Sequence, residues 1–268
     1  MASVKKFTEG AVVNQLRHCN RQIEKDSNRD IDPDRTQYNK SLTPDRNMTE
    51  YEYYKQRKSE LYCYGRADVK TMAGWIVTAP EELGKLWKEG KKQPDPEVLQ
   101  KINEFFEKTA EFLTQRYGAE NVISITTHFD EGKMEKVKDR WTGEPVKDEN
   151  GKVKEELVLG RPHLHFNFIP VVADTNKKHT QTEKICCNDR LNKIELQHFH
   201  SDLAKATNCP YVVNGKTKAQ GRNYTVEEMK ERYETAKELE RLREIERQYK
   251  LEHERTIDRT APTKGTRW

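Results

Sequence analysis

The sequence predicts an α/β fold of the α+β kind, in which helices cover one face of an antiparallel sheet. Two segments, residues 121–130 and 163–168, alternate apolar and polar side chains with the period of a strand. Between them lies only a charged excursion with the turn pairs Thr142-Gly143 and Asn150-Gly151, so we expect the two strands to be antiparallel neighbours. A long amphipathic helix precedes the first strand and needs a sheet to cover.

The other elements follow in order along the chain. Residues 11–25 have apolar positions at helical spacing, and Pro33 and Pro44 make residues 32–48 an ordered loop. Thr49 is suited to cap a short helix, and residues 72–79 favour a strand. The clearest helix begins at Pro94-Asp95-Pro96 and ends at Gly118. Residues 188–206 predict a further helix, with Leu191, Ile194, Leu196, Phe199 and Leu203 on its apolar face, and residues 226–251 a long charged one.

The alternation assigns the two faces of the sheet. Ile123, Ile125 and Phe129 are expected under the helices, together with Leu164, Phe166 and Phe168. The opposite face then carries Ser124, Thr126, His128 and Asp130 from one strand, and His163, His165 and Asn167 from the other.

Composition limits the class of protein. The 268 residues are 33% hydrophobic and 35% charged with a net charge of +4, which predicts one main domain with a hydrophilic appendage. Local basic clusters would suit a phosphate-rich partner, although a solvated face explains each cluster equally well. Five cysteines without a CxxC pair indicate neither a disulfide framework nor a zinc ribbon. With no signal peptide and no apolar run long enough to span a membrane, we expect a cytoplasmic protein.

The histidines of the open face are candidate metal ligands. Residues i and i+2 of a strand lie about 6 to 7 Å apart, so His163 and His165 can converge on one ion with His128 of the neighbouring strand. Three imidazoles with open coordination positions are typical of a catalytic site, and Asp130, Glu131 and Asn167 lie beside them. Histidines that only line a polar surface are the simpler alternative. A structural site would need a fourth ligand, for which His179, His198 and His200 are weak candidates.

Two separated motifs resemble a known family. The stretch "RHCNRQIEKDSNRDIDPDRTQYNKSLT" resembles the first motif of the MobV (Mob/Pre) plasmid mobilisation relaxases, which are HUH endonucleases. "HFDE" followed by "PHLHFNFIPV" resembles their His-x-Asp-Glu and Pro-His-x-His motifs. The resemblance covers about residues 10–210. It departs from the family in length, since residues 132–161 separate the two halves of the second motif.

The resemblance implies a fold and a set of site residues. The fold is a two-layer sandwich with a central antiparallel sheet, helices on one face and the histidine site on the other. The implied ligands of a divalent metal, Mn²⁺ or Mg²⁺, are His128, His163 and His165. His18 matches the nucleophile, Glu131 the residue that orients it or takes its proton, and Arg21 and Arg66 basic positions suited to the scissile phosphate.

The implied function is nicking and rejoining of one DNA strand at an origin of transfer, single-stranded or in a hairpin, through a 5′-phosphoryl-histidine intermediate. Such an enzyme would mobilise a plasmid or another mobile element. The residues expected to contact DNA are basic or polar, namely Arg17, Arg35, Asn39, Lys55, Arg57, Lys58, Lys216, Lys218 and Arg222.

Two alternatives remain at this stage. A tyrosine could attack in place of His18, and the candidates are Tyr38, Tyr51, Tyr53 and Tyr54. The chain could also be a non-enzymatic DNA-binding or replication-control protein with a structural metal. A hydrolase of small phosphoesters is disfavoured because a small substrate has no use for the basic clusters.

The expected domain organisation has three parts. Residues 1–222 form the relaxase domain, with a charged hairpin insertion at about 132–161. Residues 223–255 form a long charged helix whose narrow apolar stripe could begin a dimerisation region, although a solvated helix is as consistent with it. Residues 256–268 form a basic tail.

Overall fold

The computed structural model describes residues 2–22, 29–89, 94–209, 235–236 and 238–250. The chain divides into two compact units, one comprising Met1–Glu135 with Glu156–Asn214 and the other Lys136–Glu155 with Gly215–Trp268. The elements of the chain, in order, are β1 (Ala2–Thr8), α1 (Glu9–Cys19), η2 (Thr36–Tyr38), β2 (Lys40–Ser41), α2 (Glu50–Ser59), β3 (Lys70–Thr78), α3 (Glu81–Glu89), α4 (Pro96–Tyr117), η3 (Ala119–Asn121), β4 (Val122–His128), β5 (Gly132–Lys136), β6 (Glu155–Leu159), β7 (His163–Phe168), β8 (Val171–Ala173), β9 (Glu183–Ile185), α5 (Cys187–Arg190) and α6 (Lys193–Thr207).

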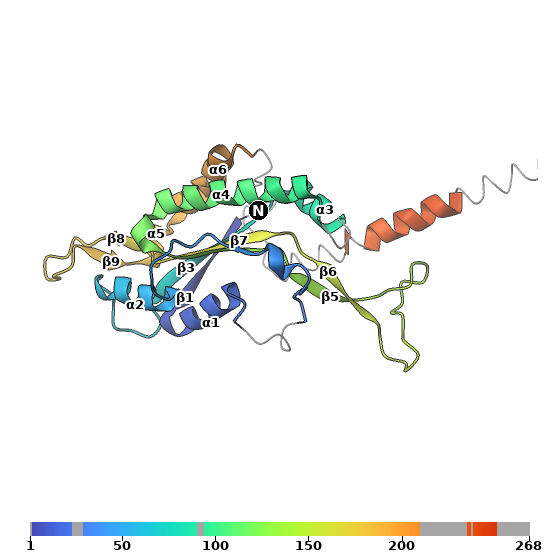
Figure 1. Cartoon of the computed structure of the whole chain (residues 1–268), viewed down its shortest axis with the longest axis horizontal. Helices are drawn as coiled ribbons and strands as arrows, with labels where there is room; N and C mark the ends of the chain where they lie inside the picture. The colour runs from blue at the N-terminus through green and yellow to red at the C-terminus, as the bar shows by residue number, and fades with distance from the viewer. Residues whose placement is uncertain (1, 23–28, 90–93, 210–234, 237, 251–268) are drawn as a thin grey trace, which may run out of the picture. The chain divides into compact units, whose positions relative to one another are not determined.

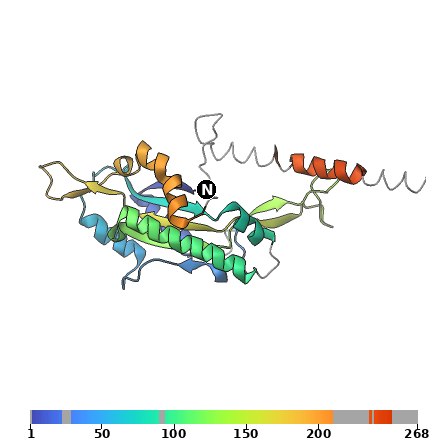
Figure 2. The ribbon, with the colours of Figure 1, turned by 90° about the horizontal axis from the view of Figure 1, so that it is seen from above.

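A five-stranded antiparallel sheet in the order β1-β3-β7-β4-β2 forms the centre of the larger unit. The predicted α/β fold with a central antiparallel sheet is confirmed, and so is the pairing of the two alternating segments as β4 and β7. Helices α3, α4 and α6 lie on one face of this sheet (Figures 1 and 2). The main core lies there, where the rings of Trp75 and Phe199 stack with centroids 3.5 Å apart.

The opposite face of the sheet is covered in part by α1 and α2 (Figure 1). Val12 and Leu16 of α1 pack there with Tyr54 of α2 in a second apolar cluster. Ile123 also belongs to this cluster, so its predicted place under α4 is wrong. The cause is a register shift between Val122 and Ser124, which turns the first part of β4 relative to the rest. The histidines therefore share their face with an apolar patch.

Helix boundaries follow the capping residues that the sequence provides. Thr49 and Glu52 form the complete capping box of α2, and Asp95 caps α4, which Gly118 ends. The single helix predicted over residues 188–206 is wrong in detail, because the chain breaks at Leu191 and Asn192 between α5 and α6. Of its predicted apolar positions, Ile194 is 69% and Leu196 40% exposed.

The excursion between β4 and β7 begins and ends as a two-stranded ribbon of β5 and β6, as predicted. In the smaller unit, residues 238–250 are helical, and Leu239, Leu242 and Tyr249 of their stripe are exposed. The remaining predicted helix residues, the basic tail, Lys216, Lys218 and Arg222 lie outside the described residues. Among the helices that the structure describes, none has the length and apolar character needed to cross a membrane.

Candidate active site

The three predicted ligand histidines come together on the sheet face shared with α1. His128 at the end of β4 pairs in register with His163 of β7, and His165 lies one side chain further along the same face. The ring centroids of His165 lie 4.7 Å from His128 and 4.9 Å from His163. Burial and the neighbouring imidazoles lower the pKa of His165 well below its ordinary value. A neutral ring with a free lone pair is the form that can bind a metal.

His18 joins this cluster from the last turn of α1. Leu16 and Val12 anchor α1 to the sheet by their burial, and His18 is then placed with its ring centroid 5.4 Å from that of His165. Burial lowers the pKa of His18, and the negative charge of Glu131 only partly opposes this. The imidazole is therefore largely neutral near pH 7, which is the nucleophilic form.

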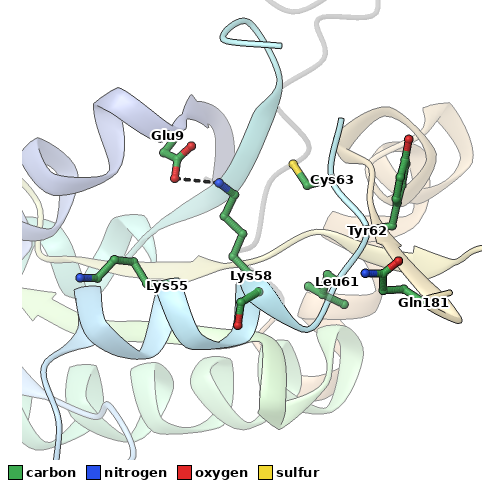
Figure 3. A pocket seen from close by; sticks show the side chains of 8 residues that line it. Glu9, Lys55, Lys58, Leu61, Tyr62, Cys63 and Gln181 are labelled. Carbon is green, nitrogen blue, oxygen red and sulfur yellow. Dashed lines mark hydrogen bonds and ion pairs between the residues drawn. The ribbon is translucent and has the colours of Figure 1, made fainter. Parts of the chain in front are cut away.

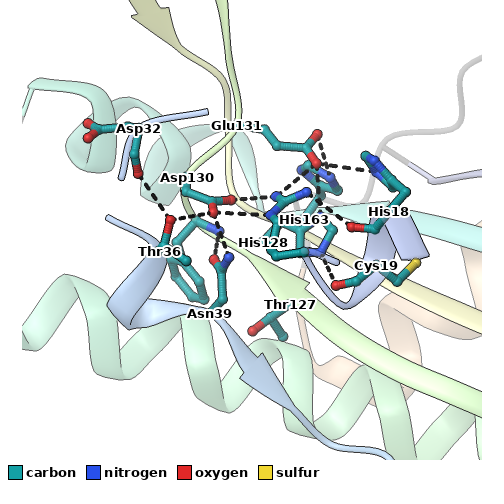
Figure 4. Close-up of polar contacts among 12 residues, drawn as sticks. His18, Cys19, Asp32, Thr36, Asn39, Thr127, His128, Asp130, Glu131 and His163 are labelled. Carbon is teal, nitrogen blue, oxygen red and sulfur yellow. Dashed lines mark hydrogen bonds and ion pairs between the residues drawn. The ribbon is translucent and has the colours of Figure 1, made fainter. Parts of the chain in front are cut away.

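Glu131 lies at the centre of the cluster (Figure 4). Its Oε1 is 3.3 Å from His18 Nε2 and 3.0 Å from His128 Nδ1, and its Oε2 is 3.3 Å from His163 Nε2. Burial acts to raise the pKa of Glu131, but the hydrogen bonds and charges of His128 and His163 outweigh it and hold the pKa far below its usual range. The carboxylate is ionised and can accept hydrogen bonds from these rings.

The main chain fixes Glu131 from two sides. On one side Ile31 forms a β-bridge to Glu131, and on the other the N–H of Gly160 donates to the Glu131 carbonyl over 2.7 Å. The two ends of the insertion are therefore bonded to each other at Glu131 and Gly160, and we call this pair the neck of the insertion. These main-chain contacts hold Glu131 beside the histidines although the insertion is long.

Arg21 contacts carboxylates, although the resemblance suits it to a phosphate. Its Nη2 lies 2.5 Å from Asp130 Oδ1 and 2.9 Å from Glu131 Oε1, and its Nη1 donates to the carbonyl of His18. Asp130 also accepts hydrogen bonds from Thr36 and Asn39 (Figure 4). Burial raises the pKa of Asp130 but these donors, Arg21 foremost, lower it by more, so Asp130 is ionised. The network ties the loop after α1 to the end of β4.

Asn167 lies beside the site as predicted. It is fully buried, and its Nδ2 donates to Ser124 Oγ over 2.9 Å and contacts Cys19 Sγ at 3.4 Å. A contact that the sequence does not indicate joins His128 Nε2 to the carbonyl of Cys19 over 2.9 Å. Any residue at position 19 has this carbonyl, so no residue type could have pointed to it. It anchors the ring of His128 to the end of α1.

Several residues predicted to meet DNA have other roles. Arg66 precedes β3, whose Lys70 pairs with Thr8, whereas His165 pairs with Ile76. Arg66 therefore lies toward the end of the sheet remote from the histidines, and its predicted place at the scissile phosphate finds no support in this position. Three others are engaged by protein groups: Arg35 is 4% exposed and lies over Trp87, Asn39 bonds Asp130 and the N–H of Phe129, and Arg57 bonds Asn121, Glu60 and Glu183. These three side chains already bond protein groups, and their predicted contacts with DNA stay predictions.

Arg17 and Lys55 are exposed, and Lys58 pairs with Glu9. These three remain candidates for contact with DNA. The predicted surface or packing histidines lie outside the cluster. His179 bonds Asp174, and His200 contacts the carbonyl of Ala2.

The structure gives the tyrosines no place among the histidines. The hydroxyl of Tyr54 is buried and donates to Thr71, and burial raises its pKa to about 12. Tyr53 donates to the carbonyl of Glu120, Tyr51 stacks on Tyr54, and Tyr38 packs edge-on against Trp87. Each tyrosine has a packing role, and only His18 reaches the cluster.

The cluster has donors suited to a divalent cation. One ligand atom each from His18, His128, Glu131 and His165 lies within 4.8 Å of the others, and His163 Nε2 is 3.1 Å from His165 Nε2. Imidazole nitrogens together with a carboxylate fit a borderline to hard divalent metal. The group within 4.8 Å contains two of the three predicted ligands, His128 and His165, together with His18 and Glu131. The third predicted ligand, His163, lies next to His165.

Comparison with known proteins places this geometry in context. The model of the plasmid recombination enzyme family, Mob_Pre, matches residues 1–235. A plasmid recombination enzyme of Streptococcus agalactiae is 22% identical over 241 residues, which are 86% of this chain and 38% of the relative, so the chain spans well under half of that relative's length.

Two solved structures of a relaxase domain have a similar fold. The manganese-bound relaxase domain MobM in complex with origin DNA of plasmid pMV158 has a TM-score of 0.57 at 23% identity, covering 86% of this chain and 97% of that one. A second structure of MobM with this origin DNA, also manganese-bound, has a TM-score of 0.53 at 20% identity, covering 87% and 97%.

Proposed function

Because the chain belongs to the plasmid recombination enzyme (Mob/Pre) family, we propose that it nicks and rejoins one DNA strand at an origin of transfer, with His18 as the nucleophile. The observation that carries this proposal is the position of Glu131, which bonds His18 and two of the strand histidines at once. Histidines that only line a polar surface would not need to share one carboxylate. The activity would serve the mobilisation of a plasmid or another mobile element.

His128, His163 and His165 would hold a divalent cation, Mn²⁺ or Mg²⁺. The MobM domain, whose fold is similar, is manganese-bound. When bound, such a cation withdraws electron density from the non-bridging oxygens of a phosphate, so that the phosphorus is more open to attack. The protein holds two of these ligands in a form suited to a metal. Burial keeps His165 neutral, and the Cys19 carbonyl orients the ring of His128.

In the proposed reaction a ring nitrogen of His18 attacks the phosphorus. The new P–N bond replaces the P–O3′ bond, the 3′-oxygen leaves and takes up a proton, and the 5′-phosphate stays on His18 as a phosphoramidate. Donation of Nε2–H to Glu131, 3.3 Å away, leaves the Nδ1 lone pair for attack. Glu131 also stabilises the positive charge that develops on the ring. The reverse reaction rejoins the strand.

DNA carrying the origin is the partner that we propose for this site. MobM binds the origin DNA of plasmid pMV158. Arg17, which is exposed on α1 and precedes His18 in the sequence, would contact the backbone next to the scissile phosphate. A second copy of the chain is the partner that we propose for the C-terminal helix, because Leu239, Leu242 and Tyr249 are exposed on it.

Incubation with manganese and supercoiled plasmids that carry candidate origins tests the function. We expect open circles with protein attached to the 5′ end at the nick, and no product after the cation is removed with EDTA. Denaturing electrophoresis before and after protease digestion measures both products. A protein that binds the plasmid but neither cuts it nor becomes attached to it would be a DNA-binding module instead.

Gly160→Ala is expected to impair cleavage through Glu131. A Cβ at Gly160 would lie 2.8 Å from the carbonyl oxygen of Glu131, and backbone atoms at this distance must shift. A displacement of about 1 Å in a catalytic group costs on the order of 100-fold in rate. Gly65→Ala is the matched control, because its Cβ would meet nothing within 4 Å. Single-turnover cleavage rates compare the two variants, and equal rates would show that the neck does not position Glu131.

A further inference from the structure

A cavity of about 450 Å³ lies at the end of the sheet remote from the histidines, lined by residues that include Lys6, Tyr64, Arg66, Lys70, Cys187 and Asn188. Lys70 is the first residue of β3, and Ile76, which pairs with His165, comes six positions later. At about 3.3 Å per residue this separation is roughly 20 Å. The cavity is therefore distinct from the candidate active site.

The lining of the cavity is cationic. Lys6 comes from β1, Lys70 from β3 and Arg66 from the segment before β3, so three separate parts of the fold bring positive charge together. Arg66 pairs with Asp68 over 3.2 Å, while Lys6 Nζ donates to the neutral amide oxygen of Asn188. Within the described part of the chain, Lys6 and Lys70 have no carboxylate within ion-pair distance. Uncompensated charges that converge in a concave site favour an anion.

The cavity lining contains one carboxylate, that of Asp68, which pairs with Arg66 and with neither lysine. Burial raises the pKa of the Cys187 thiol to about 12, although the charges of Lys6 and Lys70 act to lower it. The thiol therefore stays protonated at neutral pH. A negatively charged ligand would therefore meet two lysines that have no carboxylate partner.

An aromatic side chain stands at the same cavity. Tyr64 is 52% exposed, and its ring lies edge-on to that of Tyr62 with centroids 5.3 Å apart. Tyr62 in turn stacks on His179 at 3.4 Å, which fixes the aromatic group in place. A fixed, exposed ring beside cations suits the base or sugar next to a phosphate.

A second hollow, which Tyr62 lines, is less suited to an anion (Figure 3). It has a volume of about 350 Å³, and Lys55 and Lys58 line it. Glu9 lies 2.7 Å from Lys58 there and neutralises it. The excess of positive charge therefore lies with the larger cavity.

We propose that the cavity at Lys6, Lys70 and Tyr64 binds a phosphate group of the DNA backbone, away from the phosphate that is cut. This inference rests on the proposed function and adds to it a second contact on the same DNA. With a rise of about 3.4 Å per nucleotide in B-form DNA, 20 Å corresponds to roughly six nucleotides. Arg66, although remote from the nick, then contacts DNA after all.

The test compares the variants K6Q/K70Q and K108Q/K205Q, each of which removes two charges. Lys108 on α4 and Lys205 on α6 are exposed, and neither lines the cavity. Binding of a 20-nucleotide oligothymidylate is measured by fluorescence anisotropy from 50 to 200 mM salt. Loss of two phosphate contacts lowers the slope of log affinity against log salt by about 1.4. The affinity ratio of wild type to K6Q/K70Q is then expected to fall about sevenfold over this range.

An unchanged slope in K6Q/K70Q, or an equal change in K108Q/K205Q, would overturn the proposal. Calorimetry with inorganic pyrophosphate distinguishes a site for a free phosphate compound from a site for the DNA backbone. If K6Q/K70Q loses pyrophosphate binding while the DNA slope is unchanged, the anion site stands and its assignment to DNA is overturned. Plasmid nicking by the same preparations reports on the His18 site alone. If wild type and K6Q/K70Q differ in salt slope but the wild-type protein nicks no plasmid, the proposed nicking is contradicted and the anion site is not. Thermal unfolding midpoints confirm that both variants fold.

Discussion

Replacement of His18 by alanine is expected to abolish the covalent protein–DNA adduct and to lower cleavage by about 10⁴-fold, as loss of a nucleophile does in other covalent enzymes. His18 is the only proposed nucleophile whose ring lies with the histidines and Glu131 in the described part of the chain. DNA binding should survive, because His18 makes no contact that holds the sheet together. Denaturing gels of a 5′-labelled origin oligonucleotide measure the adduct.

His198→Ala is the matched control for this variant, since His198 is exposed on α6, on the opposite face of the sheet. The chemistry of the bond gives a second readout. A phosphoramidate on His18 hydrolyses in mild acid, whereas an ester on tyrosine survives. An adduct that persists in the His18 variant, or that resists acid, would sink the histidine assignment and return attention to the tyrosines.

The sequence was sufficient for the part of the fold that holds the site. Strict alternation in β4 and β7 leaves one register that buries the apolar side chains of both strands, and that register places His128 opposite His163. The two motifs supplied the rest, and the family assigned from them is confirmed. The placement of Ile123 fails only because one irregular residue step is invisible in a pattern of hydrophobicity.

Other elements could not be predicted because their patterns are weak. Strand β1 is an edge strand with Lys5 and Lys6 at its centre, so its alternation is interrupted by charge. Helix α3 buries Trp87 but leaves Leu86, the residue before it, 51% exposed. Both elements owe their stability to neighbours that are distant in sequence.

The polar network around the site illustrates a further limit. A basic residue near a phosphate-binding motif suggests contact with phosphate, yet Arg21 pairs with Asp130 and Glu131, more than 100 residues later in the chain. Which partner an arginine selects depends on the three-dimensional arrangement of carboxylates. Residue type alone therefore identified the members of the site but not the bonds among them.

Glu131→Gln is expected to lower the rate of cleavage by about 10² to 10⁴-fold while leaving DNA binding intact. The carboxylate accepts from His18, His128 and His163, and an amide of the same shape has only one acceptor oxygen and no charge. The variant has no negative charge with which to stabilise the positive charge on His18 during attack. Single-turnover rates with the origin oligonucleotide at saturating manganese measure the loss.

Glu156→Gln, a change of the same kind on exposed β6, is the control and should cleave at the wild-type rate. The manganese concentration needed for half-maximal rate separates the two roles of Glu131. A carboxylate that serves His18 changes the maximal rate, whereas one that mainly holds the metal ligands changes the manganese requirement. A Glu131→Gln protein that regains the full wild-type rate with excess manganese would show that Glu131 organises the histidines and takes no part in the chemistry of His18.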